Sequence, residues 1–169
     1  MNNVLIQDAA MKDVPSIRTI LKEWFQGDDL EHYIEAVKEG VQGKGDSEKF
    51  DYHYYVASFE DEVIGVGGIR KPHPKLVKFA NTENPVGFSM LYVSKNHRGG
   101  KGVGSKLFQH LVKEAKIRGY AELVVRSSIL FKDSAWGFYD KMPGLERVGQ
   151  LTPPESKRIS QIWAMKFSV

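Results

Sequence analysis

Residues 97–107 read HRGGKGVGSKL, a stretch that places four glycines within six positions beside basic side chains. Glycine is used where the backbone must adopt a positive φ or approach a ligand closely. An apolar run follows at once, with Val103, Leu107 and Leu111 at helical spacing. Because a helix N-terminus offers unpaired N–H groups and the positive end of the helix dipole, this stretch predicts an anion site, with phosphate as the expected ligand.

Three nucleotide-binding motifs compete for this layout. A GxxxxGK[ST] phosphate loop fits 99–104, but the next pair is Ser105-Lys106, in transposed order. A GxGxxG dinucleotide fingerprint starts well at 102–104, but Leu107 takes the place of the third glycine. The third motif is the acyl-coenzyme A loop [RQ]xxGx[GA], and residues 102–104 match its glycine half.

This last loop resembles the one found in the GCN5-related N-acetyltransferase (GNAT) family. Upstream, VGFSMLYV at 86–93 is an apolar, aromatic and β-branched run of strand length, similar to the fourth strand of that family. The family's Arg or Gln falls three positions before the first motif glycine, where this chain has Gly99, and Arg98 stands one residue earlier. Either the loop carries a one-residue insertion, or backbone N–H groups bind the phosphate without that side chain.

A second motif of the family, NxxAxx[FY]Y on a late helix, strengthens the resemblance. Ala135, Phe138 and Tyr139 hold the family's mutual spacing, and Lys132 occupies the Asn position. The Gly-Phe turn that follows in the family is degraded here to 144–145. Since two motifs occur in the correct order with a strand between them, the chain is identified as a member of the family.

The resemblance implies acetyl-coenzyme A as co-substrate, with no metal. Backbone groups of the strand would bind the pantetheine arm and polarise the thioester carbonyl, and the glycine loop would take the pyrophosphate. A β-carbon at Gly104 would collide with that pyrophosphate. The implied coenzyme-binding residues are Leu91, Tyr92, Val93, Arg98, Gly99, Gly100, Lys101, Gly102, Val103, Gly104, Ser105, Lys132, Ala135 and Phe138.

The same resemblance implies two catalytic positions, Tyr139 and Ser89. A phenol with a pKa near 10 is protonated at neutral pH, so Tyr139 is a candidate general acid for the departing thiolate, unless it only packs beside Phe138. Ser89 stands where many relatives carry an acidic base, and it would act by holding a water. The alternative proton acceptors are a backbone carbonyl and the side chains of Asp28, Asp29, Glu31, His53 and His73.

The implied function is transfer of an acetyl group to a primary amine by direct attack in a ternary complex. The chain has no cysteine, which excludes a covalent cysteine intermediate. The missing acidic base favours an alternative, a non-catalytic acyl-coenzyme A sensor or partner module; a triphosphatase using 99–104 is a third hypothesis. Acidic and aromatic residues in the first two helices suit a cationic acceptor, and small-molecule and peptide amines both stay open.

The elements that must position these residues follow from hydrophobic periodicity. Strands are expected at 4–9, 53–59, 62–70, 86–93, 121–128, near 145–150 and at 160–167, and helices at 14–25, 29–39, 102–119 and 133–141. Asp13 is the expected N-cap of the first helix, Glu60-Asp61 a tight hairpin turn, and 42–50 and 71–85 are expected as loops. This order predicts an α/β fold with a mixed, mostly antiparallel sheet flanked by helices, as in acyl-CoA N-acyltransferases.

The whole chain of 169 residues is the length of one domain, 1–169. Its 24 basic residues are spread among 21 acidic ones, so the net charge of +3 does not indicate a nucleic-acid partner. No apolar run has the length of a bilayer and the first residues lack the pattern of a secretory signal, so a cytoplasmic protein with no membrane partner is expected. A homodimer through the late strands, common in the family, stays open.

Overall fold

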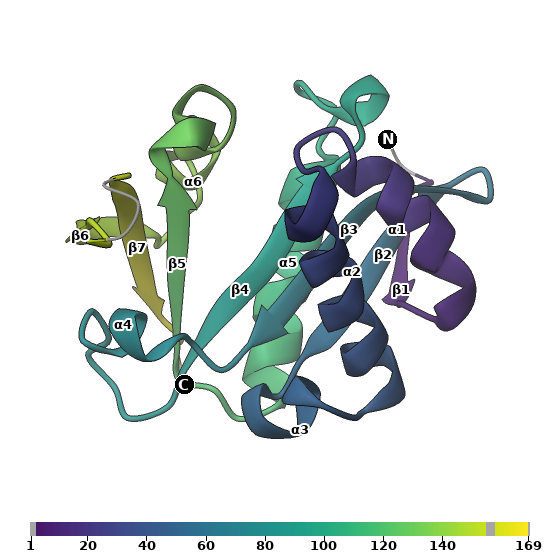
Figure 1. Ribbon diagram of the computed structural model, residues 1–169. Coiled ribbons are helices and arrows are strands. Elements are labelled where there is room, and N and C mark those ends of the chain that lie inside the picture. The colour runs from purple at the N-terminus through teal and green to yellow at the C-terminus, as the bar shows by residue number, and fades with distance from the viewer. Residues whose placement is uncertain (1–2, 155–157, 169) are drawn as a thin grey trace. The chain divides into compact units, whose positions relative to one another are not determined.

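The computed structural model describes residues 3–154 and 158–168, and the chain divides into two compact units (Figure 1). The first unit comprises Met1–Arg70 and Ser89–Glu114, and the second comprises Lys71–Phe88 and Ala115–Val169. The strands follow the order β1-β2-β3-β4-β5-β7-β6, with β4 contributing to both units. The predicted α/β fold with a mixed, mostly antiparallel sheet and flanking helices is confirmed, and the expectation of one domain stays a prediction.

The first unit contains most of the helices. Its early elements are β1 (Leu5–Asp8), the 3-10 turn η1 (Met11–Asp13), α1 (Val14–Leu21), α2 (Gly27–Gln42) and α3 (Asp46–Phe50). Its later elements are β2 (His53–Phe59), β3 (Glu62–Arg70), β4 (Pro85–Val93), the 3-10 turn η2 (Lys95–His97) and α5 (Val103–Ile117), of which β4 begins and α5 ends in the second unit.

The β2–β3 hairpin has the predicted bounds. Glu60 and Asp61 have φ angles of 49° and 65°, which place both turn residues in the left-handed region. Two residues with positive φ match the right-handed twist of the flanking strands, as in a type I′ turn. β1 then pairs antiparallel with β2, from Leu5 opposite Ser58 to Asp8 opposite Tyr55.

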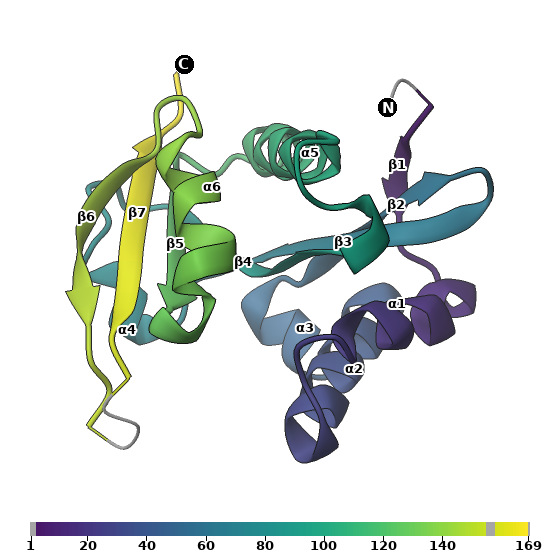
Figure 2. The same cartoon turned by 90° about the horizontal axis from the view of Figure 1, so that it is seen from above.

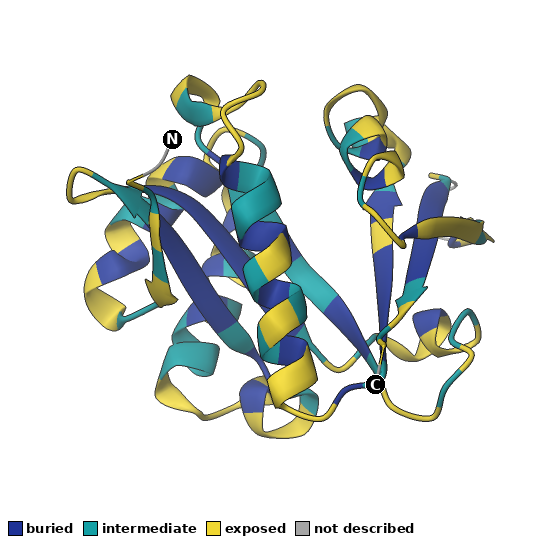
Figure 3. Ribbon diagram, turned by 180° about the vertical axis from the view of Figure 1, so that it is seen from behind, coloured by how far each residue is buried: buried dark blue, intermediate teal, exposed yellow. Residues whose placement is uncertain are grey.

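Helices cover both faces of these strands, with α1, α2 and α3 on one face and α5 on the other (Figure 2). Gly65 and Gly67 of β3 let α5 lie close: an added Cβ would be 2.9 Å from Leu107 and 3.0 Å from Leu111, respectively. Those two leucines are fully buried, and buried and exposed positions alternate along α5 (Figure 3). The two glycines of β3 therefore set how closely α5, the helix that follows the glycine-rich loop, packs on the sheet.

The first helices differ from the expectation in three ways. α1 ends at Leu21 rather than at residue 25, because the N–H groups of Trp24 and Phe25 close a turn on the Leu21 carbonyl. Asp13 occupies the predicted N-cap position of α1 but makes no capping hydrogen bond with its side chain; its carboxylate instead accepts a hydrogen bond from the N–H of Ala10 (2.8 Å) and closes the preceding η1 turn. The third difference is at 42–50, which holds α3 instead of only a loop.

α3 forms because a distant side chain caps it. The carboxylate of Glu39, on α2, accepts a hydrogen bond from the N–H of Asp46 (3.0 Å), one of the donors that a helix start leaves unpaired. Asp51 then ends the helix in the left-handed conformation, with φ of 55°. α2 itself is longer than predicted, since it begins at Gly27 and runs to Gln42.

The second unit is built around β5 (Glu122–Ser128). Its other elements are α4 (Pro74–Val77), the 3-10 turn η3 (Ile129–Phe131), the π-helical turn η4 (Lys132–Trp136), α6 (Gly137–Asp140), β6 (Glu146–Leu151) and β7 (Ser160–Lys166). β5 pairs in parallel with the start of β4, from Pro85 opposite Glu122 to Gly87 opposite Val124. β7 is antiparallel to both β5 and β6.

Two expectations in the second unit are corrected. The 71–85 connection contains α4 and is held by Glu122, whose fully buried carboxylate accepts hydrogen bonds from the N–H groups of Asn81 (2.8 Å) and Thr82 (2.9 Å). The single short helix expected at 133–141 is a π-helical turn followed by α6. Such π-helical turns are rare and frequently mark functional sites.

Candidate functional site

The glycine-rich loop has the backbone that its sequence predicts. Gly99, Gly100 and Gly102 have φ angles of 80°, 87° and 79°, a region that other L-residues rarely adopt. A Cβ added at any of the three would meet nothing within 4 Å. These glycines are therefore required by the backbone conformation and not by packing, and they leave the loop backbone uncovered.

The loop leads directly into α5, whose start is fixed by packing. Val103 is buried with Leu107 in a cluster that includes Ala57, Ile64 and Val93 of the neighbouring strands. The N–H of Lys106 bonds to the carbonyl of Gly102 (3.1 Å), so the N–H groups of residues 103–105 precede the first helical hydrogen bond of that turn. An anion is stabilised at such a helix end.

The two basic side chains of the loop are engaged by the protein itself. The ammonium of Lys101 donates to the carbonyl of Asn96 (2.8 Å). The guanidinium of Arg98 donates to the carboxylate of Glu23 (3.2 Å) and lies over the indole of Trp24, with 4.2 Å from Cζ to the ring centroid. Both cations thus already make contacts within the protein, whereas the backbone N–H groups of residues 103–105 precede the first helical hydrogen bond.

Aromatic side chains from the α1–α2 connection surround Tyr92 of β4. The ring centroids of Trp24 and Tyr92 are 4.8 Å apart, and those of Phe25 and Tyr92 are 5.5 Å apart in an edge-to-face arrangement. Phe25 also contacts Tyr33 of α2 at 4.4 Å. Tyr92 of the predicted coenzyme-binding strand is therefore in contact with the connection between α1 and α2, where the sequence predicts acidic and aromatic residues suited to a cationic acceptor.

Ser89 lies in β4 beside a buried tyrosine. Among the described residues, the hydroxyls of Ser89 and Tyr54 are both buried without a hydrogen-bond partner of ordinary geometry. Both side chains lie close to Gly68, where an added Cβ would be 2.4 Å from Ser89 Oγ and 2.5 Å from the Tyr54 ring. Burial raises the pKa of Tyr54, and the nearby Ser89 hydroxyl offsets part of that rise. Neither group is a base at neutral pH, so a proton leaving an amine here needs another acceptor.

Several of the other predicted proton acceptors are already engaged. The hydrogen bonds from Arg18 lower the pKa of Glu31, which makes that carboxylate a weaker base. His53 Nε2 lies 2.7 Å from a carboxylate oxygen of Asp51. His73 uses Nδ1 to accept a hydrogen bond at the start of α4. The two exposed acids in the first turn of α2 are Asp28 and Asp29.

Tyr139 belongs to the second unit, where it packs in α6. It is 7% exposed, its ring centroid lies 5.0 Å from that of Trp163, and Phe138 contacts it at 5.4 Å. Burial raises the pKa of Tyr139, so the phenol stays protonated throughout the neutral range. This is the protonation state that a general acid requires.

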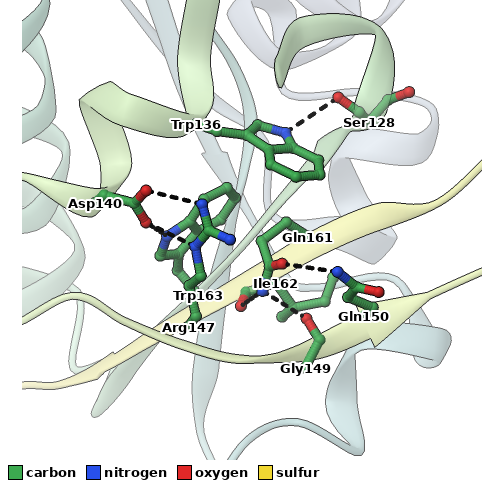
Figure 4. A network of polar contacts seen from close by, with 9 residues as sticks. All are labelled: Ser128, Trp136, Asp140, Arg147, Gly149, Gln150, Gln161, Ile162 and Trp163. Atoms are coloured by element: carbon green, nitrogen blue, oxygen red, sulfur yellow. Dashed lines mark hydrogen bonds and ion pairs between the residues drawn. The ribbon is translucent and has the colours of Figure 1, made fainter. Parts of the chain in front are cut away.

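Polar contacts in the second unit hold Trp163 (Figure 4), the ring on which Tyr139 packs. The carboxylate of Asp140 accepts hydrogen bonds from Arg147 (2.8 and 2.9 Å) and from the indole of Trp163 (3.0 Å). Arg147, and then Trp163, hold the pKa of Asp140 below its usual range. The indole of Trp136 donates to the carbonyl of Ser128 (3.2 Å), which ties the π-helical turn to β5.

The predicted site residues form two groups, one in each unit. Ser89, 91–93 and 98–105 belong to the first unit, and the residues of the second motif belong to the second unit. Of the latter, Lys132 is exposed and its ammonium lies 5.9 Å from the Trp136 ring centroid. In the described part of the chain, no three His, Cys, Asp or Glu side chains gather as metal ligands.

Two residues were not foreseen from the sequence, Glu23 beside the glycine-rich loop and Tyr54 beside Ser89. Glu23 was one more polar position of a predicted helix, and nothing local indicates its contact with Arg98. Tyr54 was one aromatic among several in a strand. A signal for Tyr54 existed in Gly40 and Gly68, glycines inside a helix and a strand, where an added Cβ would come within 2.6 Å and 2.5 Å of its ring, respectively.

Comparison with known sequences identifies the class of protein. The acetyltransferase (GNAT) family matches residues 14–143, and the chain belongs to this family. Membership implies transfer of an acyl group from acetyl-coenzyme A, and the family predicted from the two motifs is confirmed. A search of curated proteins found no match.

Solved structures agree with this fold. A protein from Desulfovibrio desulfuricans described as a GNAT-family acetyltransferase superposes with a TM-score of 0.77 at 18% identity, over 96% of this chain and 98% of that chain. A ribosomal-protein-alanine N-acetyltransferase from Brucella melitensis gives 0.72 at 20% identity, over 96% and 99%. The PaiA N-acetyltransferase from Thermoplasma acidophilum, in complex with coenzyme A, gives 0.65 at 14% identity, over 97% and 99%.

Proposed function

We propose that the protein transfers the acetyl group of acetyl-coenzyme A to a primary amine, which attacks directly while both substrates are bound. The observation that carries the proposal is the loop with three left-handed glycines that leads into α5, in a chain of the GNAT family. The acceptor is a small-molecule or peptide amine.

Residues 99–105 suit a pyrophosphate through their backbone. Their N–H groups lie at a helix start, and the glycines leave them uncovered. Leu91, Tyr92 and Val93 would contribute backbone groups to the pantetheine arm. Bound acetyl-coenzyme A supplies an already activated thioester, so the protein has only to orient the amine, stabilise the oxyanion and manage protons.

Tyr139 would donate the proton that the thiolate requires on leaving. Its raised pKa keeps the phenol protonated, and the Asp140–Trp163 hydrogen bond holds the ring against which it packs. Ser89 would orient a water that carries the amine's proton away, because its own hydroxyl is not basic. No cysteine is present to form an acyl-enzyme, which agrees with direct attack.

A thermal-shift comparison tests the proposal. Coenzyme A or acetyl-coenzyme A should stabilise the protein by about 2.7 kcal/mol at one hundred times the dissociation constant, whereas ATP with Mg²⁺ should not. Thiol release is then measured across polyamines, amino acids, aminoglycosides and peptides with an N-terminal alanine, the last because of the Brucella neighbour. Stabilisation without thiol release on any acceptor would instead support an acyl-coenzyme A sensor, and a larger shift with ATP would reject the coenzyme site.

A further inference from the structure

The carboxylate of Glu23 joins two segments that are distant in sequence. Glu23 lies just after α1, and both of its oxygens accept a hydrogen bond from the N–H of Lys95, at 2.9 and 3.1 Å. One of them also accepts from the guanidinium of Arg98 at 3.2 Å. The side chains of Glu23 and Arg98 are 19% and 36% exposed, so this is a surface ion pair whose weight comes from the three hydrogen bonds that one carboxylate accepts rather than from burial. Glu23 thus accepts hydrogen bonds from both ends of the segment 95–98.

The next residue, Trp24, is held by the same partners. Its indole contacts both the guanidinium of Arg98, at 4.2 Å, and the ring of Tyr92, at 4.8 Å. A guanidinium that is bound by a carboxylate and also rests on an aromatic face loses both interactions when it turns toward another anion. Phe25 also contacts Tyr92, with ring centroids 5.5 Å apart. Residues 23–25 and the glycine-rich loop therefore form one packed and hydrogen-bonded assembly.

We propose that Glu23 is a positioning residue that couples the coenzyme loop to the α1–α2 connection, and that Arg98 serves as a strut between them rather than as a phosphate ligand. The inference rests on the proposed function and adds to it a physical link between the two substrates. Coenzyme that binds residues 99–105 fixes 95–98, and through Glu23 it fixes 23–25. Those residues border Tyr92 and α2, where an acceptor would be recognised.

A phosphate-binding role for Arg98 would reverse the expected effect of neutralising Glu23 on coenzyme affinity. If Arg98 left Glu23 to bind the pyrophosphate, Glu23 would compete with the coenzyme, and neutralising Glu23 would tighten coenzyme binding. If Arg98 is a strut, neutralising Glu23 loosens the loop and weakens binding. The direction of the change in the dissociation constant of coenzyme A therefore separates the two roles.

The experiment compares Glu23→Gln, Arg98→Ala and the double variant with wild type. Glu48→Gln is the matched control, because Glu48 is an exposed residue of α3 and its substitution removes the same charge. Calorimetry measures the dissociation constant of coenzyme A, and hydrogen exchange measures how far coenzyme A protects residues 22–26. In wild type we expect coenzyme A to increase protection of that segment.

If Arg98 is a strut, the dissociation constant of coenzyme A should rise about tenfold in Glu23→Gln, which is of the order expected for a lost charge-assisted hydrogen bond. The double variant should be no worse than the more damaged single variant, and the coenzyme-induced protection of 22–26 should be lost. On a confirmed acceptor, KM should rise more than kcat falls. Tighter binding by Glu23→Gln, or unchanged protection, overturns the inference. Failure of wild type to bind coenzyme A would instead overturn the proposed function.

Discussion

At the scale of single residues, the chemistry depends on groups whose surroundings set their protonation. Tyr139 and Tyr54 are both buried phenols with raised pKa values, but their neighbours differ. Tyr139 packs on an indole that Asp140 fixes, whereas Tyr54 lies between two glycines and faces Ser89. The first arrangement positions a proton donor, and the second fills the core beneath β4.

Replacing Tyr139 with Phe removes one hydroxyl and keeps the ring that packs on Trp163, so folding and coenzyme affinity should survive. If Tyr139 protonates the thiolate, kcat should fall roughly 10²-fold, as expected for a lost general acid. Water can substitute for the phenol, in which case the loss is nearer tenfold, or about 1.4 kcal/mol of barrier. Steady-state kinetics on one confirmed acceptor, with coenzyme affinity measured separately, checks this. An unchanged kcat would leave Tyr139 with a packing role alone.

His110 on α5 should make stability depend on pH. Its ring meets that of Tyr55 edge to face, with centroids 4.8 Å apart, and burial lowers its pKa, although Glu114 and Asp8 oppose that effect and Lys113 adds to it. The unfolded state then binds the proton more readily than the folded state. The contribution of the neutral His110 to stability is fully present above about pH 6.5, the ordinary pKa of histidine, and is lost as the pH falls below that value. Urea unfolding at several pH values should show that His110→Gln loses less free energy of unfolding than wild type as the pH falls. An equal loss in the two proteins would assign the pH dependence to other groups.

At the scale of elements, regular patterns were predicted well and long-range side-chain contacts were not. The β2–β3 hairpin has the predicted bounds because alternation and the Glu60-Asp61 turn are local properties. α3 was missed because its cap is the side chain of Glu39 on another helix. The candidate site follows the same rule: the glycine motif was readable, but the partner of Arg98 was not, since Glu23 lies 75 residues away in sequence.

The loop that leads into α5 permits a matched test of its backbone. Gly102→Ala places a side chain at a φ of 79°, and Gly119→Ala does the same at 87° beyond the end of α5; neither Cβ meets an atom within 4 Å. Both should cost about 1–2 kcal/mol of stability. Of the two glycine variants, only Gly102→Ala should also weaken coenzyme A binding. The loss should exceed that of Lys101→Ala, because the ammonium of Lys101 in the wild type donates to the carbonyl of Asn96. Equal coenzyme affinity in the two glycine variants would contradict a backbone cradle.

At the scale of the whole molecule, the two compact units are continuous through regular structure. The boundary at 88–89 falls inside β4, and the boundary at 114–115 falls inside α5. The chain enters the second unit at residue 71, returns within a strand and leaves again within a helix. Among the described helices, none is long and apolar enough to cross a bilayer. Because unfolding either unit would break a strand and a helix of the other, the units should be coupled in stability.

We therefore expect one cooperative unfolding transition, as for a single domain of this length. Far-UV circular dichroism reports mainly on the first unit, which holds α1, α2, α3 and most of α5. In a Trp24→Phe variant, tryptophan fluorescence reports on the second unit alone, through Trp136 and Trp163. The two signals should give the same urea midpoint in that variant, and saturating coenzyme A should shift both together. Two separate midpoints, or a shift confined to circular dichroism, would show that the units fold independently and would contradict the prediction of one domain over residues 1–169.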